Sequence, residues 1–246
     1  MKGLVWFRRD LRLRDNPALS AACQECQEIV PLFVFDEPLL RSHAFGSACV
    51  GFMLGCLEEL RRSLALHGVS LAWRTGDPVE SVIQAASDFK VDAVYWNRDY
   101  EPAALERDRT VQQRLAQQGR TVRTFKDHVV FEAEEVRGQS GDPFQRYSAS
   151  RDRWWSKWRA AAPPLLGIPS FPPAGKASAS DSREWPSVAD LGYESVPMWI
   201  EPGEQAVHAR LQWFLGGPVH QYVTGRNLPA SDGTSKLSPH LRFGTV

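Results

Sequence analysis

Three hydroxyl side chains lie close together in the stretch DGTSKLSPHLRFG (232–244). Thr234, Ser235 and Ser238 surround an expected turn, and Ser238 followed by Pro239 is a typical N-cap and first residue of a helix. Free N–H groups and the positive dipole end of such a helix attract phosphate groups. The stretch therefore predicts a phosphate-binding loop, with simple capping of the helix as the structural alternative.

A second pair of chemically useful side chains precedes this loop. Tyr222 and Arg226 are four residues apart, which places them on the same face of a helix. We therefore expect them to face one ligand or partner together.

Two charged segments, RRDLRLRD (8–15) and NRDYEP (97–102), follow strand-like stretches. In an open parallel sheet, ligands bind beyond the carboxyl ends of the strands, which is where these segments are expected. Neither contains the G-x-G-x-x-G or G-x-x-x-x-G-K-[ST] pattern of a nucleotide-binding loop. Taken alone, they favour ion pairs that brace the loops over a ligand site.

The segment FQRYSASRDRWWSKWR (144–159) interleaves five basic side chains with five aromatic ones. Arginines that bind phosphate and aromatic rings that stack on bases would suit nucleic acid. The same pattern is typical of an amphipathic helix that docks its tryptophans between two domains. We favour docking as the interpretation.

These candidate residues depend on a regular alternation of strands and helices over the first 125 residues. Strands are predicted over 3–7, 28–35, 69–74, 91–96 and 121–125, and helices over 17–22, 50–64, from 78 onward and over about 103–118. Strands that alternate with helices of this length form right-handed βαβ units and a mainly parallel sheet. The expected fold is an α/β, Rossmann-like domain.

Prolines and capping residues refine these elements. Asn16 before Pro17 predicts an N-cap followed by proline at the first helical position, as Asp77 does before Pro78. Glu80 completes a predicted capping box with Asp77. Pro31 predicts either that its strand lies at an edge of the sheet or that the proline itself lies early in the strand.

The alternation ends near residue 126. Residues 160–203 are rich in Pro, Ala, Ser and Gly, and a loop-like connection of this length is unusual inside one compact domain. Helical periodicity returns over 207–215 and stops at Gly216-Gly217-Pro218. We therefore expect an α/β domain at 1–130, an interdomain linker at 131–203 and the beginning of an all-α domain at 204–246.

Composition narrows the function classes. The 246 residues include 29 basic and 29 acidic side chains, a balance that argues against an indiscriminate nucleic-acid coat. No apolar run approaches the roughly 20 residues of a membrane span, and the first residues have charge where a signal peptide is apolar. The four cysteines suit reduced thiols, with Cys23 and Cys26 packed in the core, so we expect a cytoplasmic protein.

Three longer motifs occur in an order that identifies a family. VWFRRDLRLRDNPAL, YWNRDYEP and YVTGRNLPASDGTSKLSPHLRFG resemble the photolyase/cryptochrome family, and the resemblance runs along the whole chain. Among its branches, the sequence looks most like bacterial class I cyclobutane pyrimidine dimer photolyases. The family combines an N-terminal α/β antenna domain, a long linker and an all-helical C-terminal domain that holds FAD.

The resemblance implies roles for individual residues. By similarity, Tyr222 contacts FAD, and the loop that surrounds the FAD phosphates is formed by Thr234, Ser235, Lys236, Leu237 and Ser238. Arg226 matches an arginine that contacts the backbone of damaged DNA near the lesion.

The function implied is light-dependent repair of cyclobutane pyrimidine dimers by a deoxyribodipyrimidine photolyase. In the family's mechanism, reduced FAD donates an electron to the flipped-out dimer, the ring splits and the electron returns. The catalytic residues are expected beyond residue 246, so this chain alone is expected to be inactive. The complete protein is expected to be a monomer. A cryptochrome-type photoreceptor and a stand-alone pigment- or nucleotide-binding module are the alternatives.

The resemblance also bears on an antenna pigment. Family members that use a folate carry an Asn-Glu pair just after the second motif, where this chain has Pro102-Ala103-Ala104. Asp99, by similarity to deazaflavin-binding members, is expected to face the pigment, so a deazaflavin is favoured over a folate. Cys49 stands where relatives usually have arginine, which points to an altered pocket.

Overall fold

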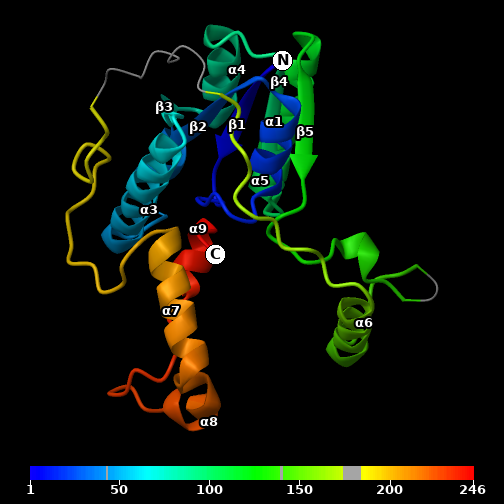
Figure 1. The fold of residues 1–246 in the computed structure, drawn as a ribbon, viewed down its shortest axis with the longest axis vertical. Coiled ribbons are helices and arrows are strands. Elements are labelled where there is room, and N and C mark those ends of the chain that lie inside the picture. Colours follow the sequence, from blue (N-terminus) through cyan, green and yellow to red (C-terminus); the bar gives the residue numbers. More distant parts are fainter. Residues whose placement is uncertain (43, 139–140, 174–183) are drawn as a thin grey trace.

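A five-stranded parallel sheet forms the centre of the computed structural model, which describes residues 1–42, 44–138, 141–173 and 184–246 (Figure 1). The strands are β1 (Lys2–Phe7), β2 (Glu28–Asp36), β3 (Ala72–Gly76), β4 (Ala93–Asn97) and β5 (Thr121–Phe125). Their order is β3-β2-β1-β4-β5, and every neighbouring pair is parallel. The predicted Rossmann-like α/β fold is confirmed.

Two of the strands begin later than predicted, at residues 72 and 93. The backbone N–H of Val69 donates to Leu64 and that of Val91 donates to Ala86, so both amides close the preceding helix. Val69 and Val91 are therefore buried in the core, although they precede the first residues of β3 and β4.

In the described part of the chain, helices cover both faces of the sheet (Figure 1). One face carries α1 (Pro17–Glu25) and α3 (Ser47–Leu66), and the other carries α4 (Pro78–Asp88) and α5 (Pro102–Gln117). A short helix, α2 (Glu37–Arg41), follows β2. The connections from β1 to β3 run over one face of the sheet, and those from β3 to β5 run over the other. The strand order therefore reverses between β1 and β4, which is where doubly wound sheets bind ligands.

The predicted helix starts are largely confirmed. The side chain of Asn16 accepts a hydrogen bond from the backbone N–H of Leu19, and that of Asp77 accepts one from Glu80. The predicted capping box is wrong, because the carboxylate of Glu80 binds Arg114 on α5 instead of reaching back to the backbone of residue 77.

Pro31 lies in an interior strand, opposite Val5 of β1. The ladder between β2 and β3 begins only at Leu32. The proline therefore lies early in the strand, before both sides are paired, and the edge-strand alternative is wrong.

The segment after β5 leaves the sheet and contains η1 (Ala133–Glu135) and α6 (Tyr147–Ala160) (Figure 1). No residue of α6 is buried. The ring of Trp154 stacks on Trp158 at a centroid distance of 5.5 Å and meets Phe131 edge-on at the same distance. Among the described residues, these aromatic rings pack on one another and on Phe131, and their docking between two domains stays a prediction.

The chain then returns along the body of the molecule. Leu166 contacts the α/β domain through Asp15, and Trp185 packs edge-on against Phe35 and Trp73. Residues 174–183 of the predicted linker lie outside the described residues.

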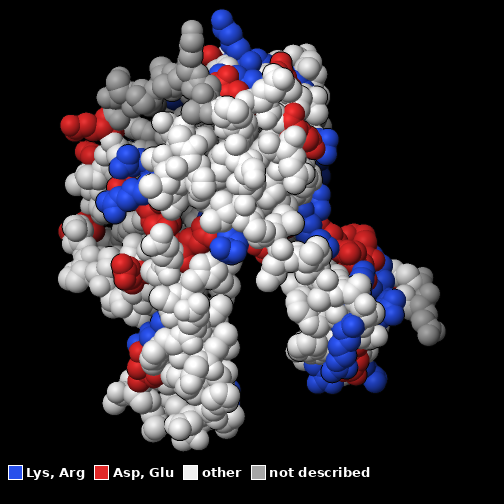
Figure 2. All heavy atoms as spheres, viewed as in Figure 1, with Lys and Arg blue, Asp and Glu red and all other residues white. Residues whose placement is uncertain are grey.

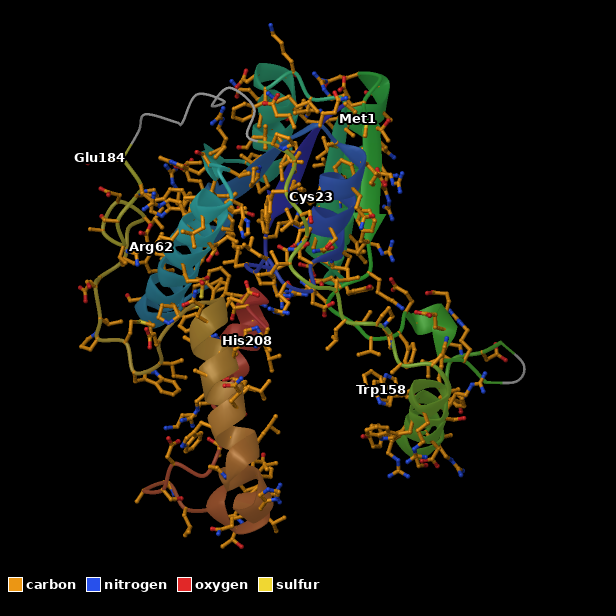
Figure 3. The ribbon with its side chains drawn as sticks, in the orientation of Figure 1. Met1, Cys23, Arg62, Trp158, Glu184 and His208 are labelled. Atoms are coloured by element: carbon orange, nitrogen blue, oxygen red, sulfur yellow. The ribbon has the colours of Figure 1, made fainter. Side chains whose placement is uncertain are left out.

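The last part contains α7 (Glu204–Gly216), η2 (Pro218–Gln221), α8 (Tyr222–Gly225) and α9 (Ser238–Phe243). Both ends of this part are buried against the α/β body, at Glu204 and Val207 and again at His240 and Phe243. The residues between them form a projection, on which Figure 3 labels His208, separate from the projection that carries Trp158 (Figures 1 and 3). No helix among the described residues is long and apolar enough to cross a bilayer.

Candidate functional site

A cavity of about 400 Å³ lies at the carboxyl ends of β1, β2 and β4. Its apolar wall includes Trp6 and Phe35 from the strands, Met53 from α3 and Phe243 from α9. A concave, largely apolar space with a few polar groups is the usual character of a small-molecule site. The size and the aromatic lining suit a flat organic ligand.

The two charged segments that follow β1 and β4 meet beside this cavity. The side-chain amide of Asn97 donates to Asp10 at 2.7 Å and to Asn16 at 2.9 Å, and all three residues are buried. This hydrogen-bond network fixes the loops, and the predicted ion pairs also join the two segments, between Arg9 and both Asp99 and Glu101. It also turns other members of the same segments, among them Arg9 and Asp99, toward the cavity.

An ion-pair bridge closes one side of the cavity. The Nη1 atom of Arg9 lies 2.5 Å from Oε1 of Glu101, and Nη1 of Arg242 lies 3.2 Å from the same oxygen. Burial opposes ionisation of Glu101, but the hydrogen bonds and charges of both arginines outweigh it and lower its pKa. The guanidinium of Arg242 also lies 5.6 Å from the ring centre of Phe45.

Asp99 lines the cavity, but its carboxylate is largely occupied. Oδ1 accepts the backbone N–H groups of Tyr100 at 2.7 Å and Glu101 at 3.2 Å, and Oδ2 lies 3.7 Å from Arg9. Burial would raise the pKa of Asp99, but the backbone hydrogen bonds and Arg9 reverse this and lower it. The residue is therefore a fixed anion that shapes the wall.

The opposite wall pairs two arginines with an indole. The guanidinium carbons of Arg8 and Arg107 lie 4.7 Å and 5.0 Å from the ring centre of Trp6. Both arginines bind Asp108, and burial together with the charge of Arg8 lowers the pKa of Arg107. One carboxylate thus serves two cations, so this wall is polar and positive beside a π surface.

The predicted phosphate loop packs against α7 and α8. Arg210 of α7 donates to the carbonyl oxygens of Thr234 and Ser235 and forms a two-point ion pair with Asp232. Lys236 lies 2.7 Å from the same carboxylate and has a left-handed backbone, with φ of 55°.

Several hydrogen-bond donors of this loop are free among the described residues. In the part of the chain that the structure describes, the N–H groups and hydroxyls of Thr234 and Ser235 have no hydrogen-bond partner, and the hydroxyl of Ser238 has none. Free N–H and O–H donors beside a lysine fit the phosphates of a dinucleotide.

The predicted cap at Ser238 is wrong. Leu237 is the N-cap of α9, Ser238 is the first helical residue, and no side chain caps the helix. The helical conformation of residue 237 starts the turn one position early, which leaves the serine hydroxyl free.

Tyr222 and Arg226 lie on one turn, as the spacing predicted, with the guanidinium 5.7 Å from the phenol ring centre. Their turn touches the loop where two glycines meet: a Cβ on Gly225 would lie 3.2 Å from Cα of Gly233. The structure therefore brings the two predicted FAD elements together. It does not bring them to the α/β cavity.

The helix α9 connects the two regions. Arg242 and Phe243 at its end line the cavity, while its first residues continue the loop at 234–238. Its end is held by the loop after β1, because the backbone N–H of Leu11 donates to Phe243 at 3.0 Å and Arg12 donates to Gly244 at 3.0 Å.

Sequence reasoning missed several residues that build these regions, notably Arg107, Glu204, Arg210 and Arg242. Glu204 is buried and accepts the backbone N–H groups of Leu13 at 2.8 Å and residue 14 at 3.1 Å. Charged residues within helical segments gave no local signal, because their partners are distant in sequence.

Comparison with known proteins agrees with this arrangement. A family model described as DNA photolyase matches residues 3–170. A deoxyribodipyrimidine photo-lyase from a Synechococcus strain is 33% identical over 258 residues, which covers 99% of this chain and 51% of the relative. Cryptochrome-1 of Arabidopsis thaliana is also 33% identical, over 251 residues, covering 99% of this chain and 36% of that relative.

A solved structure gives the same result. The crystal structure of a bacterial class III photolyase from Agrobacterium tumefaciens matches with a TM-score of 0.80 and 29% identity, covering 100% of this chain and 51% of that one. The chain spans about half the length of the photolyases that it matches. It belongs to the DNA photolyase family.

Proposed function

We propose that this chain supplies the antenna cavity and the FAD phosphate loop of a light-dependent DNA repair flavoprotein that acts on cyclobutane pyrimidine dimers. The observation that carries the proposal is the position of α9. One short helix forms a wall of the α/β cavity through Phe243 and continues the donor-rich loop at 234–238. Two chromophores held at these places would lie on the same structural element.

In this proposal, Thr234, Ser235 and Ser238 bind the pyrophosphate of FAD through free donors, and Lys236 adds positive charge. Tyr222, which is 41% exposed, contacts another part of the cofactor. Bound FAD supplies the light-driven electron chemistry. The chain's own residues bind and orient it, and the exposed Arg226 contacts the DNA backbone near the lesion.

The α/β cavity is proposed to hold an antenna pigment of the deazaflavin class. Ala103 and Ala104 contribute small side chains to its wall, which leaves width for a fused ring system. Trp6 and the arginines beside it supply a π surface and polar donors. Asp99 shapes the wall, and its internal hydrogen bonds argue against a direct ionic contact with the pigment.

Four free thiols are compatible with action in the cytoplasm, and we propose that the complete protein acts as a monomer. The exposed apolar side chains of the α7 projection, among them Leu215, Val223 and Leu228, are proposed to be covered by further helices of the family's FAD domain. Figure 2 shows that the visible face of this projection is largely uncharged.

A chimera tests the proposal directly. Residues 1–246 are fused to the helical half of the Synechococcus photo-lyase, reconstituted with FAD, and given an oligonucleotide that contains one thymine dimer. We expect repair in blue light and none in darkness, with the unfused chain inactive in both. A chimera that folds and binds FAD but repairs nothing in blue light contradicts the proposal.

A cryptochrome-type photoreceptor is the second candidate, because the identity to Arabidopsis cryptochrome-1 equals that to the Synechococcus photo-lyase. Light-dependent binding of a protein partner, without repair of the dimer, would favour this candidate. Pigment binding by residues 1–246, together with a chimera that binds FAD but neither repairs the dimer nor binds a partner in light, would favour the stand-alone module.

A further inference from the structure

We propose that Arg210 is a positioning residue for the flavin phosphate loop: it holds the loop carbonyls on one side so that the loop donors face the pyrophosphate. This inference rests on the proposed function, because it assigns the residue through the loop at 234–238. The residue lies on α7, outside the loop and outside the α/β cavity.

The contacts of Arg210 are directed and numerous. Its Nε atom lies 2.9 Å from the carbonyl oxygen of Ser235, and Nη2 lies 2.7 Å from that of Thr234. Nη1 and Nη2 bind the two carboxylate oxygens of Asp232 at 2.8 Å and 2.7 Å. One planar group therefore binds three residues of the loop, Asp232, Thr234 and Ser235.

A stacked indole fixes the guanidinium in turn. Its carbon lies 3.8 Å from the ring centre of Trp213, and the side chain of Arg210 is 22% exposed. Stacking and partial burial orient the plane of the fork before any ligand arrives. A lysine ammonium has neither the planar geometry nor enough donors to reproduce these contacts.

The consequence for the loop follows from its backbone. A peptide unit carries its N–H opposite its C=O, so fixing the carbonyls of Thr234 and Ser235 toward α7 turns the N–H groups of Ser235 and Lys236 to the other side. Neither of these two N–H groups has a hydrogen-bond partner among the described residues. Lys236, in its left-handed conformation, pairs with Asp232, the carboxylate that Arg210 also binds.

Asp232 completes the arrangement as the shared anion. Hydrogen bonds from Arg210, and then from Lys236, lower the pKa of its carboxyl well below the ordinary range. It therefore remains ionised at any pH near neutrality and partly neutralises the two cations. Replacing it with asparagine would free Lys236 but leave the carbonyl contacts of Arg210 in place.

Ligand binding separates positioning from general support. Purified wild type, Arg210→Ala, Arg210→Lys and Asp232→Asn are titrated with FAD, with ADP, which has adenosine and the pyrophosphate but no flavin ring, and with riboflavin, which has the ring and the ribityl chain but no phosphate. Arg151→Ala serves as the matched control, because Arg151 makes an exposed two-bond pair with Asp152 on α6. Melting temperature reports the fold of each variant.

For both substitutions of Arg210 we expect affinity for FAD and for ADP to fall about tenfold or more, with riboflavin binding unchanged. Asp232→Asn should cost less than Arg210→Ala, and Arg151→Ala should change nothing. With ligand at saturation, hydrogen exchange should show protection of amides 234–237 by ADP in wild type and weaker protection in Arg210→Ala.

Each other outcome contradicts a defined claim. If wild type binds ADP and Arg210→Ala or Arg210→Lys binds it equally well, the positioning role is wrong and the proposed flavin loop stands. If Arg210→Ala weakens riboflavin as much as ADP, the residue supports the fold and does not position the loop. If wild type binds neither FAD nor ADP, the flavin role of the loop in this chain is wrong, and the assignment of Arg210 fails with it.

Discussion

Gly244 lies so close to the backbone of Arg9 that no side chain fits between them. A Cβ on Gly244 would overlap the carbonyl oxygen of Arg9 and lie 2.7 Å from its carbonyl carbon. The glycine also has a left-handed backbone, with φ of 60°, which ends α9. The contact fixes the end of α9 on the loop after β1, and with it the side chains that line the cavity.

Replacing Gly244 with alanine is therefore expected to destabilise the protein by about 2–4 kcal/mol, from left-handed strain plus overpacking against rigid backbone. Urea unfolding measures the change. Gly119→Ala is the matched control, because Gly119 has φ of 75° but open space around it, and should cost only about 1 kcal/mol. Equal losses of unfolding free energy in the two variants would show that the close contact between Gly244 and Arg9 does not add to the cost.

The buried ion pair between Arg12 and Asp127 gives a second prediction. Nη2 of Arg12 lies 2.5 Å from Oδ1 of Asp127, and both side chains are less than a tenth exposed. Burial raises the pKa of Asp127 even though Arg12 opposes it. Asp127→Asn should therefore cost about 3 kcal/mol, because it leaves a buried cation without its counter-ion.

A double substitution checks the cause of that loss. Arg12→Met with Asp127→Leu removes both charges and should be more stable than Asp127→Asn alone in urea unfolding, since the guanidinium that lost its main counter-ion is no longer buried. Arg12 also donates to the carbonyl of residue 15, so the double variant should not regain the full wild-type stability. A double variant less stable than the single one would contradict the charge argument.

His240 predicts a dependence of stability on pH. Its Nδ1 lies 2.8 Å from the hydroxyl oxygen of Thr245, its ring packs edge-on against Phe52, and Nε2 has no partner among the described residues. Burial lowers the pKa of His240 below 6.5. The unfolded chain therefore takes up a proton more readily, and stability is full above about pH 6.5 and falls as the pH drops below it.

Melting temperatures at about pH 7.5 and about pH 5 measure the effect. The loss between the two pH values should be smaller in His240→Asn than in wild type, because the variant has no buried base to protonate. His208→Gln, which changes a more exposed histidine on α7, should leave the wild-type difference intact. An unchanged pH effect in His240→Asn would exclude this residue as its origin.

Local sequence patterns were sufficient to predict the sheet, but they were not sufficient to predict how residues 204–246 pack. Apolar strands and capping residues such as Asn16 and Asp77 act within a few residues, so the sequence predicted the α/β domain. The spacing of Tyr222 and Arg226 placed them correctly on one turn for the same reason.

Contacts between distant parts of the chain were beyond such patterns. Glu204 binds the backbone near residue 13, and Arg242 binds Glu101, although more than a hundred residues separate each pair. The docking of α6 was predicted from its tryptophans, but aromatic content does not specify which surface they meet. The cap at Ser238 failed because one helical residue, Leu237, precedes it.

A large side chain introduced into the α/β cavity should prevent the proposed pigment from binding. Cys49 of α3 lines the cavity and is half-buried, so Cys49→Trp places an indole where the pigment is proposed to lie. Ala48→Trp adds the same ring to an exposed neighbour outside the lining. Cys49→Trp should retain the wild-type circular dichroism but bind no pigment, and Ala48→Trp should bind as wild type does.

The most direct measurement is the near-ultraviolet and visible absorption spectrum of the purified chain, supplied in turn with a deazaflavin, riboflavin and a reduced folate, with the retained pigment identified by mass after denaturation. We expect wild type to retain a planar pigment, a deazaflavin before a folate, and Cys49→Trp to retain none. A colourless wild type after all three, or the same pigment retained by Cys49→Trp, would contradict the assignment of the α/β cavity as an antenna site.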